Sequence, residues 1–138
     1  MLHNIAPILS PDLLWTLRAM GHGDEIVIAD ANFPAQSSGP RCIRLDGISA
    51  TDTVAAILTL LPLDTFVPSP AHTMQVVDDP NTVPEIVSEF QALIPDYKIA
   101  PLERFSFYDR AAKAFAVVQT GETRLYGNII LTKGVIGS

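Results

Sequence analysis

The chain of 138 residues lacks most of the features that mark whole classes of proteins. Its single cysteine, Cys42, excludes a disulfide within the chain and any zinc site built from several cysteines, and it is typical of a reducing compartment. No apolar run approaches the roughly 20 residues that span a bilayer, and residues 1–5 lack the basic start of a secretion signal. We therefore expect a cytoplasmic protein without a membrane partner.

Positive charge is also scarce. The chain has 9 Lys and Arg residues against 15 Asp and Glu, which gives a net charge of −6. An acidic chain without clustered basic residues does not offer the surface that nucleic acid requires. Charged residues make up only 17% of the chain and hydrophobic residues 48%, against a usual charged share of about a quarter. Such a polar-poor surface on a small chain predicts apolar contacts between subunits, so we expect a homo-oligomer.

The pattern of apolar residues predicts helices that alternate with strands in a single domain over residues 1–138, which is the α/β fold class. Capping residues followed by helical spacing predict helices that begin near Ser10, Ser49 and Thr82. Apolar runs predict strands at 25–31, 41–45, 74–77, 115–119 and 128–132, and residues 104–113 are predicted to begin as a strand and pass into a short helix. The run Ile26–Ala29 is apolar throughout, which is typical of a strand buried on both faces.

The strongest candidate for chemistry is His22, which lies between Gly21 and Gly23 and just before the first strand. Glycine reaches backbone angles that are closed to other residues, and histidine exchanges a proton near neutral pH. Asp30 lies near the carboxyl end of this strand, the end at which ligands bind in open α/β sheets. We expect this carboxylate to lie within reach of His22. The same spacing also fits a purely structural role, in which Gly21 caps the preceding helix and His22 is a solvated loop residue.

The residues needed for several other chemistries are missing. The sequence has no H-x-x-x-H or Cys–His pairing, so we expect no metal site. It has no G-x-x-x-x-G-K loop to hold a phosphate. Cys42 is predicted to lie in an apolar strand, where a thiol is usually inert. Proton transfer and the binding of a polar ligand are the chemistries that the sequence still allows.

Three further groups are candidates for binding. Arg104 precedes an aromatic cluster and offers a forked set of donors. The segment Tyr126–Asn128 offers a phenol, an amide and, at Gly127, an unobstructed backbone N–H. Asp30 can accept hydrogen bonds from ligand hydroxyls. Each also has a purely structural alternative, as a surface ion pair, a turn or a loop cap. Together these groups suit a neutral polyhydroxylated ligand better than an anion.

Several separated motifs, in the same order, resemble those of the fucose mutarotase/ribose pyranase family, and in particular its L-fucose mutarotase branch. They are Met20–Glu25, Ala29–Ala35, Arg104–Ala111, Thr120–Glu122 and Tyr126–Asn128. The glycine after the histidine, the Phe-Pro-Ala loop and the arginine favour this branch over the pyranase branch. The resemblance covers essentially the whole chain and is weakest between Pro62 and Pro101.

This resemblance implies an isomerase that interconverts the α and β anomers of L-fucose, or of a related monosaccharide, by acid/base ring opening without cofactor or metal. His22 matches the catalytic histidine, and the positions that match sugar-binding residues are Asp30, Arg104, Tyr126, Gly127 and Asn128. The implied fold is a compact α/β domain with a mixed sheet flanked by helices, assembled into ring-like oligomers, a pentameric ring or a homodecamer. Ribose pyranase activity and non-catalytic monosaccharide binding are the alternatives.

Overall fold

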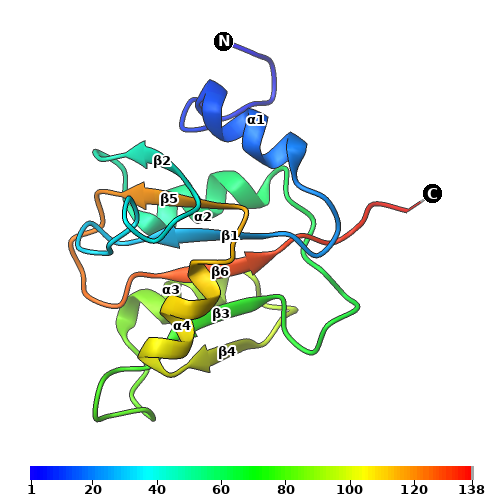
Figure 1. The fold of residues 1–138 in the computed structure, drawn as a ribbon. Helices are drawn as coiled ribbons and strands as arrows, with labels where there is room; N and C mark the ends of the chain where they lie inside the picture. The colour runs from blue at the N-terminus through cyan, green and yellow to red at the C-terminus, as the bar shows by residue number, and fades with distance from the viewer. Residues whose placement is uncertain (138) are drawn as a thin grey trace.

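The computed structural model describes residues 1–137, which form one six-stranded sheet with four helices packed against it (Figure 1). The helices are α1 (Pro11–Ala19), α2 (Ala50–Leu58), α3 (Glu85–Leu93) and α4 (Arg104–Ala111). The strands are β1 (Glu25–Ala29), β2 (Arg41–Leu45), β3 (Ala71–Met74), β4 (Ile99–Leu102), β5 (Ala116–Thr120) and β6 (Ile129–Thr132). None of the four helices within residues 1–137 is long and apolar enough to cross a bilayer.

The strands lie in the order β2-β5-β1-β6-β3-β4, and β6 alone among them runs against the others. The five parallel strands therefore end at one edge of the sheet, which we call the carboxyl edge. They begin at the opposite edge, which we call the amino edge. Because β6 is antiparallel, it begins at the carboxyl edge and ends at the amino edge. The expected mixed sheet flanked by helices is confirmed.

Successive side chains of β1 enter two separate apolar clusters on the two faces of the sheet. Ile26 and Ile28 pack with residues of α1, α2 and α3, whereas Val27 and Ala29 pack beneath α4. Figure 1 shows α4 on the face of the sheet opposite to α2 and α3. Burial on both faces explains why the apolar run in β1 is continuous rather than alternating.

Two strand assignments made from the sequence need correction. The strand predicted at 74–77 lies at Ala71–Met74 instead, and the chain turns away after it through a bridge between Val76 and Asp79. Strand β4 was not predicted at all. It contains Pro101, which lacks a backbone N–H and is tolerated because β4 lies at the free edge of the sheet.

Two helix starts also differ from the prediction. Helix α4 begins directly at Arg104, with no preceding strand residue, because the Glu103 carboxylate accepts hydrogen bonds from the first backbone N–H groups of the helix. The capping box predicted from Thr82 does not form. Pro84 occupies the cap position of α3 without a side-chain bond, and the Thr82 hydroxyl bonds to Asp79.

Gly121 begins the loop between β5 and β6, and its backbone N–H donates to the Ile48 carbonyl oxygen at 2.8 Å. A Cβ at position 121 would lie 2.0 Å from the carbonyl oxygen of Asp46, which belongs to the backbone and cannot rotate away. We expect Gly121→Ala to lower the free energy of unfolding in urea by about 1–3 kcal/mol because of this overpacking. Gly47→Ala is the matched control, because a Cβ there meets nothing within 4 Å. Equal stability of the two variants would contradict the packing described here.

Candidate active site

Four of the predicted binding residues line one small pocket at the carboxyl edge. The pocket measures about 230 Å³. Its lining comprises Asp30, Asn32, Phe33, Met74, Val77, Arg104, Tyr108, Leu125, Tyr126 and Asn128. These residues come from the end of β1, the end of β3 and the segment after it, the first turns of α4 and the loop before β6. They meet because the parallel strands end, and β6 begins, at the same edge of the sheet.

Asp30 and Asn128 form a reciprocal pair in the wall of this pocket, although 98 residues separate them. The Asp30 backbone N–H donates to Asn128 Oδ1 at 2.8 Å, and Asn128 Nδ2 donates to Asp30 Oδ2 at 3.0 Å. Burial raises the pKa of the Asp30 carboxyl, against the opposing effect of donors that include the backbone N–H groups of Asn32 and Gly127. Asp30 is therefore a partly desolvated acceptor facing a small polar pocket.

Tyr126 is held in an unusual backbone conformation, with φ at 64°. Its hydroxyl oxygen accepts a hydrogen bond from the Val77 backbone N–H at 3.1 Å. Gly127 follows directly, and its backbone N–H points to Asp30. The turn thus brings Tyr126 and Asn128 to the pocket wall and the Gly127 N–H to the Asp30 carboxylate.

Arg104 lies at the start of α4 and forms no ion pair within residues 1–137. Its guanidinium carbon lies 5.2 Å from the centre of the Phe105 ring and 5.7 Å from that of Tyr108. Tyr108 was not predicted as a site residue. Its position one helical turn after Arg104 is a signal that could have found it, because residues four apart lie on the same helix face.

His22 lies at the opposite, amino edge of the sheet. Helix α1 ends because Met20 adopts an extended conformation, so Gly21 is not the left-handed cap that its position suggested. The left-handed residue is Gly23, with φ at 85°, and its backbone N–H donates to the Lys133 carbonyl oxygen at 2.9 Å. The His22 loop is thereby attached to the chain just after β6.

The imidazole of His22 is paired with a buried carboxylate. Its Nε2 lies 3.1 Å from Asp64 Oδ1, and the side chains of His22 and Asp64 are 46% and 3% exposed. The Phe66 backbone N–H donates to the same carboxylate at 3.0 Å, and this bond, followed by the bond to His22, holds the pKa of Asp64 below its usual value. The Asp64 backbone N–H donates to the Thr132 carbonyl oxygen. Sequence reasoning missed Asp64, because no spacing signal joins residues 42 positions apart.

The expectation that the Asp30 carboxylate lies within reach of His22 is wrong for a single chain. Strand β1 lies between them and spans about 13 Å on its own. Asp30 follows its last residue and His22 precedes its first. The structure therefore holds two separate candidate sites, a histidine–aspartate pair at the amino edge and a polar pocket at the carboxyl edge, which we call the two half-sites.

Neither a metal site nor the hollow beside β4 and α3 competes with these half-sites for the chemistry. Within residues 1–137 no group of three or more His, Cys, Asp or Glu side chains is placed to hold a metal ion. A hollow of about 360 Å³ beside β4 and α3 is lined by apolar, hydroxyl and amide residues and has no ionisable side chain. Catalysis by proton transfer needs ionisable groups, so the two half-sites are the better candidates.

A small α/β domain with a histidine paired to a carboxylate, and with a separate pocket of polar side chains, is typical of a protein that binds or acts on a small polar molecule. The chain belongs to the RbsD / FucU transport protein family, whose profile matches residues 3–136. It is 48% identical to the fucose mutarotase of Homo sapiens over 145 residues, which covers 98% of this chain and 94% of the human protein. The resemblance noted from the sequence motifs is thus confirmed.

Two solved structures give the same result for the fold. The fucose mutarotase of Streptococcus pneumoniae in complex with L-fucose is 45% identical, with a TM-score of 0.92 and coverage of 99% of this chain and 100% of that one. The RbsD protein of Bacillus subtilis in complex with D-ribose is 26% identical, with a TM-score of 0.79 and the same coverage. The chain is therefore more similar in sequence and structure to this mutarotase than to this ribose-binding relative.

We expect Asn128→Ala to lower the free energy of unfolding by about 1–3 kcal/mol, because it leaves the buried Asp30 N–H without its acceptor. Urea denaturation followed by circular dichroism measures the change. Asn81→Ala removes an exposed loop asparagine and serves as the control. A loss at Asn128 no larger than at Asn81 would show that the reciprocal pair does not support the fold.

Proposed function

We propose that this protein is an L-fucose mutarotase, an isomerase that interconverts the α and β anomers of the sugar. The observation that carries the proposal is the full-length likeness to a fucose mutarotase solved with L-fucose, at 45% identity and a TM-score of 0.92. The human relative that bears the same name supports it at 48% identity. A cytoplasmic location, expected from the sequence, stays a prediction.

The reaction requires two proton transfers in each direction. Ring opening places a proton on the ring oxygen and removes one from the anomeric hydroxyl, which gives the open-chain aldehyde. Rotation about the adjacent carbon–carbon bond presents the other face of the carbonyl, and closure reverses both transfers. No net proton, electron or group is gained, so the protein has only to bind the sugar and move protons.

In this proposal His22 moves the protons and Asp64 orients it. The Asp64 carboxylate faces Nε2 of the imidazole, so Nδ1 is the nitrogen left to face a substrate. In the neutral ring with its proton on Nε2, Nδ1 accepts a proton as a base. In the protonated ring, Nδ1 returns it as an acid.

The carboxyl-edge pocket binds the sugar hydroxyls. Asp30 supplies an anionic acceptor, Arg104 a fork of donors, and the Tyr126–Asn128 turn a phenol, a backbone N–H and an amide. The set contains both donors and acceptors, which suits hydroxyl groups, because a hydroxyl both donates and accepts. An uncharged sugar is therefore a better ligand than an anion.

We further propose that each active site forms between two copies of the chain, with His22 and Asp64 from one and the carboxyl-edge pocket from the other. The pocket, at about 230 Å³, is smaller than the roughly 300–1,000 Å³ usual for ligand sites. Large apolar side chains are exposed beside both half-sites, including Phe66 at the amino edge and Leu125 at the carboxyl edge. Contact between two different surfaces closes into a ring when the rotation allows it, in keeping with the pentameric ring or decamer implied by the family resemblance.

We expect His22→Ala to reduce the exchange between the anomers of L-fucose by about 10²–10⁴-fold, because the acid–base group is lost. Saturation-transfer NMR at equilibrium measures the rate, and ribose and galactose in the same assay rank the alternative substrates. His3→Ala is the control, because His3 is exposed near the N-terminus. Wild-type exchange in a folded His22→Ala protein would remove His22 from the mechanism. Sugar binding without faster exchange in the wild type would favour a non-catalytic binding protein.

Mixed oligomers test the shared site. Oligomers assembled from equal amounts of His22→Ala and Asp30→Asn subunits should regain activity, because about a quarter of the contacts then join two intact half-sites. The matched control mixes His22→Ala with Asp64→Asn. Both changes damage the same half-site, so this mixture should stay inactive. If verified mixed oligomers of the first pair stay as inactive as the second, each site lies within one chain. Light scattering that shows only monomers would likewise contradict the ring.

A further inference from the structure

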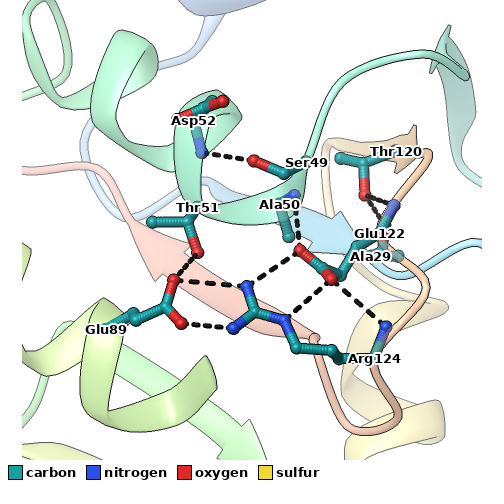
Figure 2. Close-up of polar contacts among 9 residues, drawn as sticks. All are labelled: Ala29, Ser49, Ala50, Thr51, Asp52, Glu89, Thr120, Glu122 and Arg124. Atoms are coloured by element: carbon teal, nitrogen blue, oxygen red, sulfur yellow. Dashed lines mark hydrogen bonds and ion pairs between the residues drawn. The ribbon is translucent and has the colours of Figure 1, made fainter. Parts of the chain in front are cut away.

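Arg124 lies in the loop that presents Tyr126–Asn128, but it is not among the residues that line the carboxyl-edge pocket. Figure 2 shows its guanidinium between two carboxylates, Glu122 in the same loop and Glu89 on α3. Nε donates to Glu122 Oε1 at 3.0 Å and Nη2 to Glu89 Oε1 at 3.2 Å, and Nη1 also donates to Glu89. One planar fork of donors therefore joins the loop to a helix.

Glu122 connects this bridge to the strand that carries Asp30. Its carboxylate is almost fully buried and accepts a hydrogen bond at 3.2 Å from the backbone N–H of Ala50, the first residue of α2. Its backbone carbonyl oxygen accepts a hydrogen bond at 2.8 Å from the N–H of Ala31, directly after Asp30. The bridge thus reaches α2, α3 and the end of β1.

The Glu122 side chain is also in contact with the binding turn. A Cβ at Gly127 would lie 2.9 Å from Glu122 Cγ and 3.1 Å from Ile86 Cδ1, so the turn rests directly on these two side chains. Tyr126 next to it has a left-handed backbone conformation that a non-glycine residue adopts only when its surroundings impose it. A shift of Glu122 would therefore displace Gly127 and, with it, Asn128.

The ionisation of Glu122 and Glu89 depends on the nearby guanidinium of Arg124. Hydrogen bonding to Arg124 is the main reason why the pKa values of Glu122 and Glu89 lie below those of ordinary glutamates. Both carboxylates are therefore ionised at neutral pH. Without the guanidinium, Glu122 would be a buried anion without a cation, which a protein relieves by moving the side chain or taking up a proton.

We propose that Arg124 is a positioning residue for the sugar pocket, which it serves by joining Glu122 to Glu89 and so fixing the Tyr126–Asn128 turn against Asp30. The proposal rests on the sugar-binding function proposed above. It assigns Arg124 no contact with the sugar and no part in proton transfer. Its effect passes through the geometry of the turn.

The kinetic consequence is a loss of sugar affinity rather than of chemistry. We expect Arg124→Met to raise the KM for L-fucose about tenfold and to change kcat much less, because the turn binds the sugar while His22 moves the protons. Arg124→Lys keeps the charge but not the fork, so it should restore part of the affinity. Arg41→Met is the matched control. It removes an arginine from an exposed ion pair with Asp12, far along the chain from the loop, and should leave KM unchanged.

Glu89→Gln tests the same bridge from its other end without touching the loop. We expect it to raise KM in the same direction, and the double variant Arg124→Met/Glu89→Gln to be no worse than Arg124→Met alone, because both changes break one connection. Additive effects of the two changes would show that the residues act separately and would overturn the proposal. A fall in kcat with no change in KM would do the same.

A measurement without sugar separates this proposal from the proposed function. The side-chain amide NMR signal of Asn128 and the hydrogen exchange of residues 123–128 report on the turn whether or not the protein is a mutarotase. In an Arg124→Met oligomer of unchanged size, we expect the Asn128 signal to shift and exchange in this segment to quicken, while exchange in β1 stays the same. An unchanged turn would overturn the proposal even if the wild type proves to be an active mutarotase. A wild type without activity would instead count against the function.

Discussion

The reversed direction of β6 determines where both half-sites lie. Because this strand runs antiparallel between β1 and β3, the loop before it reaches the edge at which the parallel strands end, and Asn128 can bond to Asp30. The residues at its other end, Thr132 and Lys133, accept backbone hydrogen bonds from the Asp64 and His22 loops. A parallel strand in this position would place Asn128 at the amino edge, and the pocket would lose an entire wall.

The pKa values of the carboxyl groups in the two half-sites are shifted in opposite directions. Asp30 is buried in the pocket wall, and burial raises the pKa of its carboxyl in spite of several donors. Asp64 is buried too, but the Phe66 N–H and His22 hold its pKa down. Asp64 contacts the imidazole of His22, whereas Asp30 faces the carboxyl-edge pocket. The environments of the two carboxyl groups therefore differ in burial and in the donors that face them.

Local chemistry predicted the elements whose boundaries are set locally. Ser10 caps α1 and Ser49 caps α2 as their sequence patterns indicate, and β1 and β2 lie where their apolar patterns predicted them. The strand errors fall where tertiary pairing decides the outcome, as in the edge strand β4 and the upstream shift of β3. The starts of α3 and α4 are errors of local capping, at Thr82 and Glu103.

The same division applies to the site. Motif order and strand ends predicted the residues at the carboxyl edge. The expected contact between His22 and Asp30 overlooked the strand that the sequence itself predicts between them. Sequence patterns could not predict that Asp64 is the partner of His22. The two residues lie in separate loops, which meet only because each loop bonds to the end of β6. A chain of 138 residues has little depth for a closed cleft. In the shared site that we propose, copies that meet edge to edge enclose the histidine–aspartate pair of one chain with the shallow pocket of the next, so that assembly takes the place of a second domain.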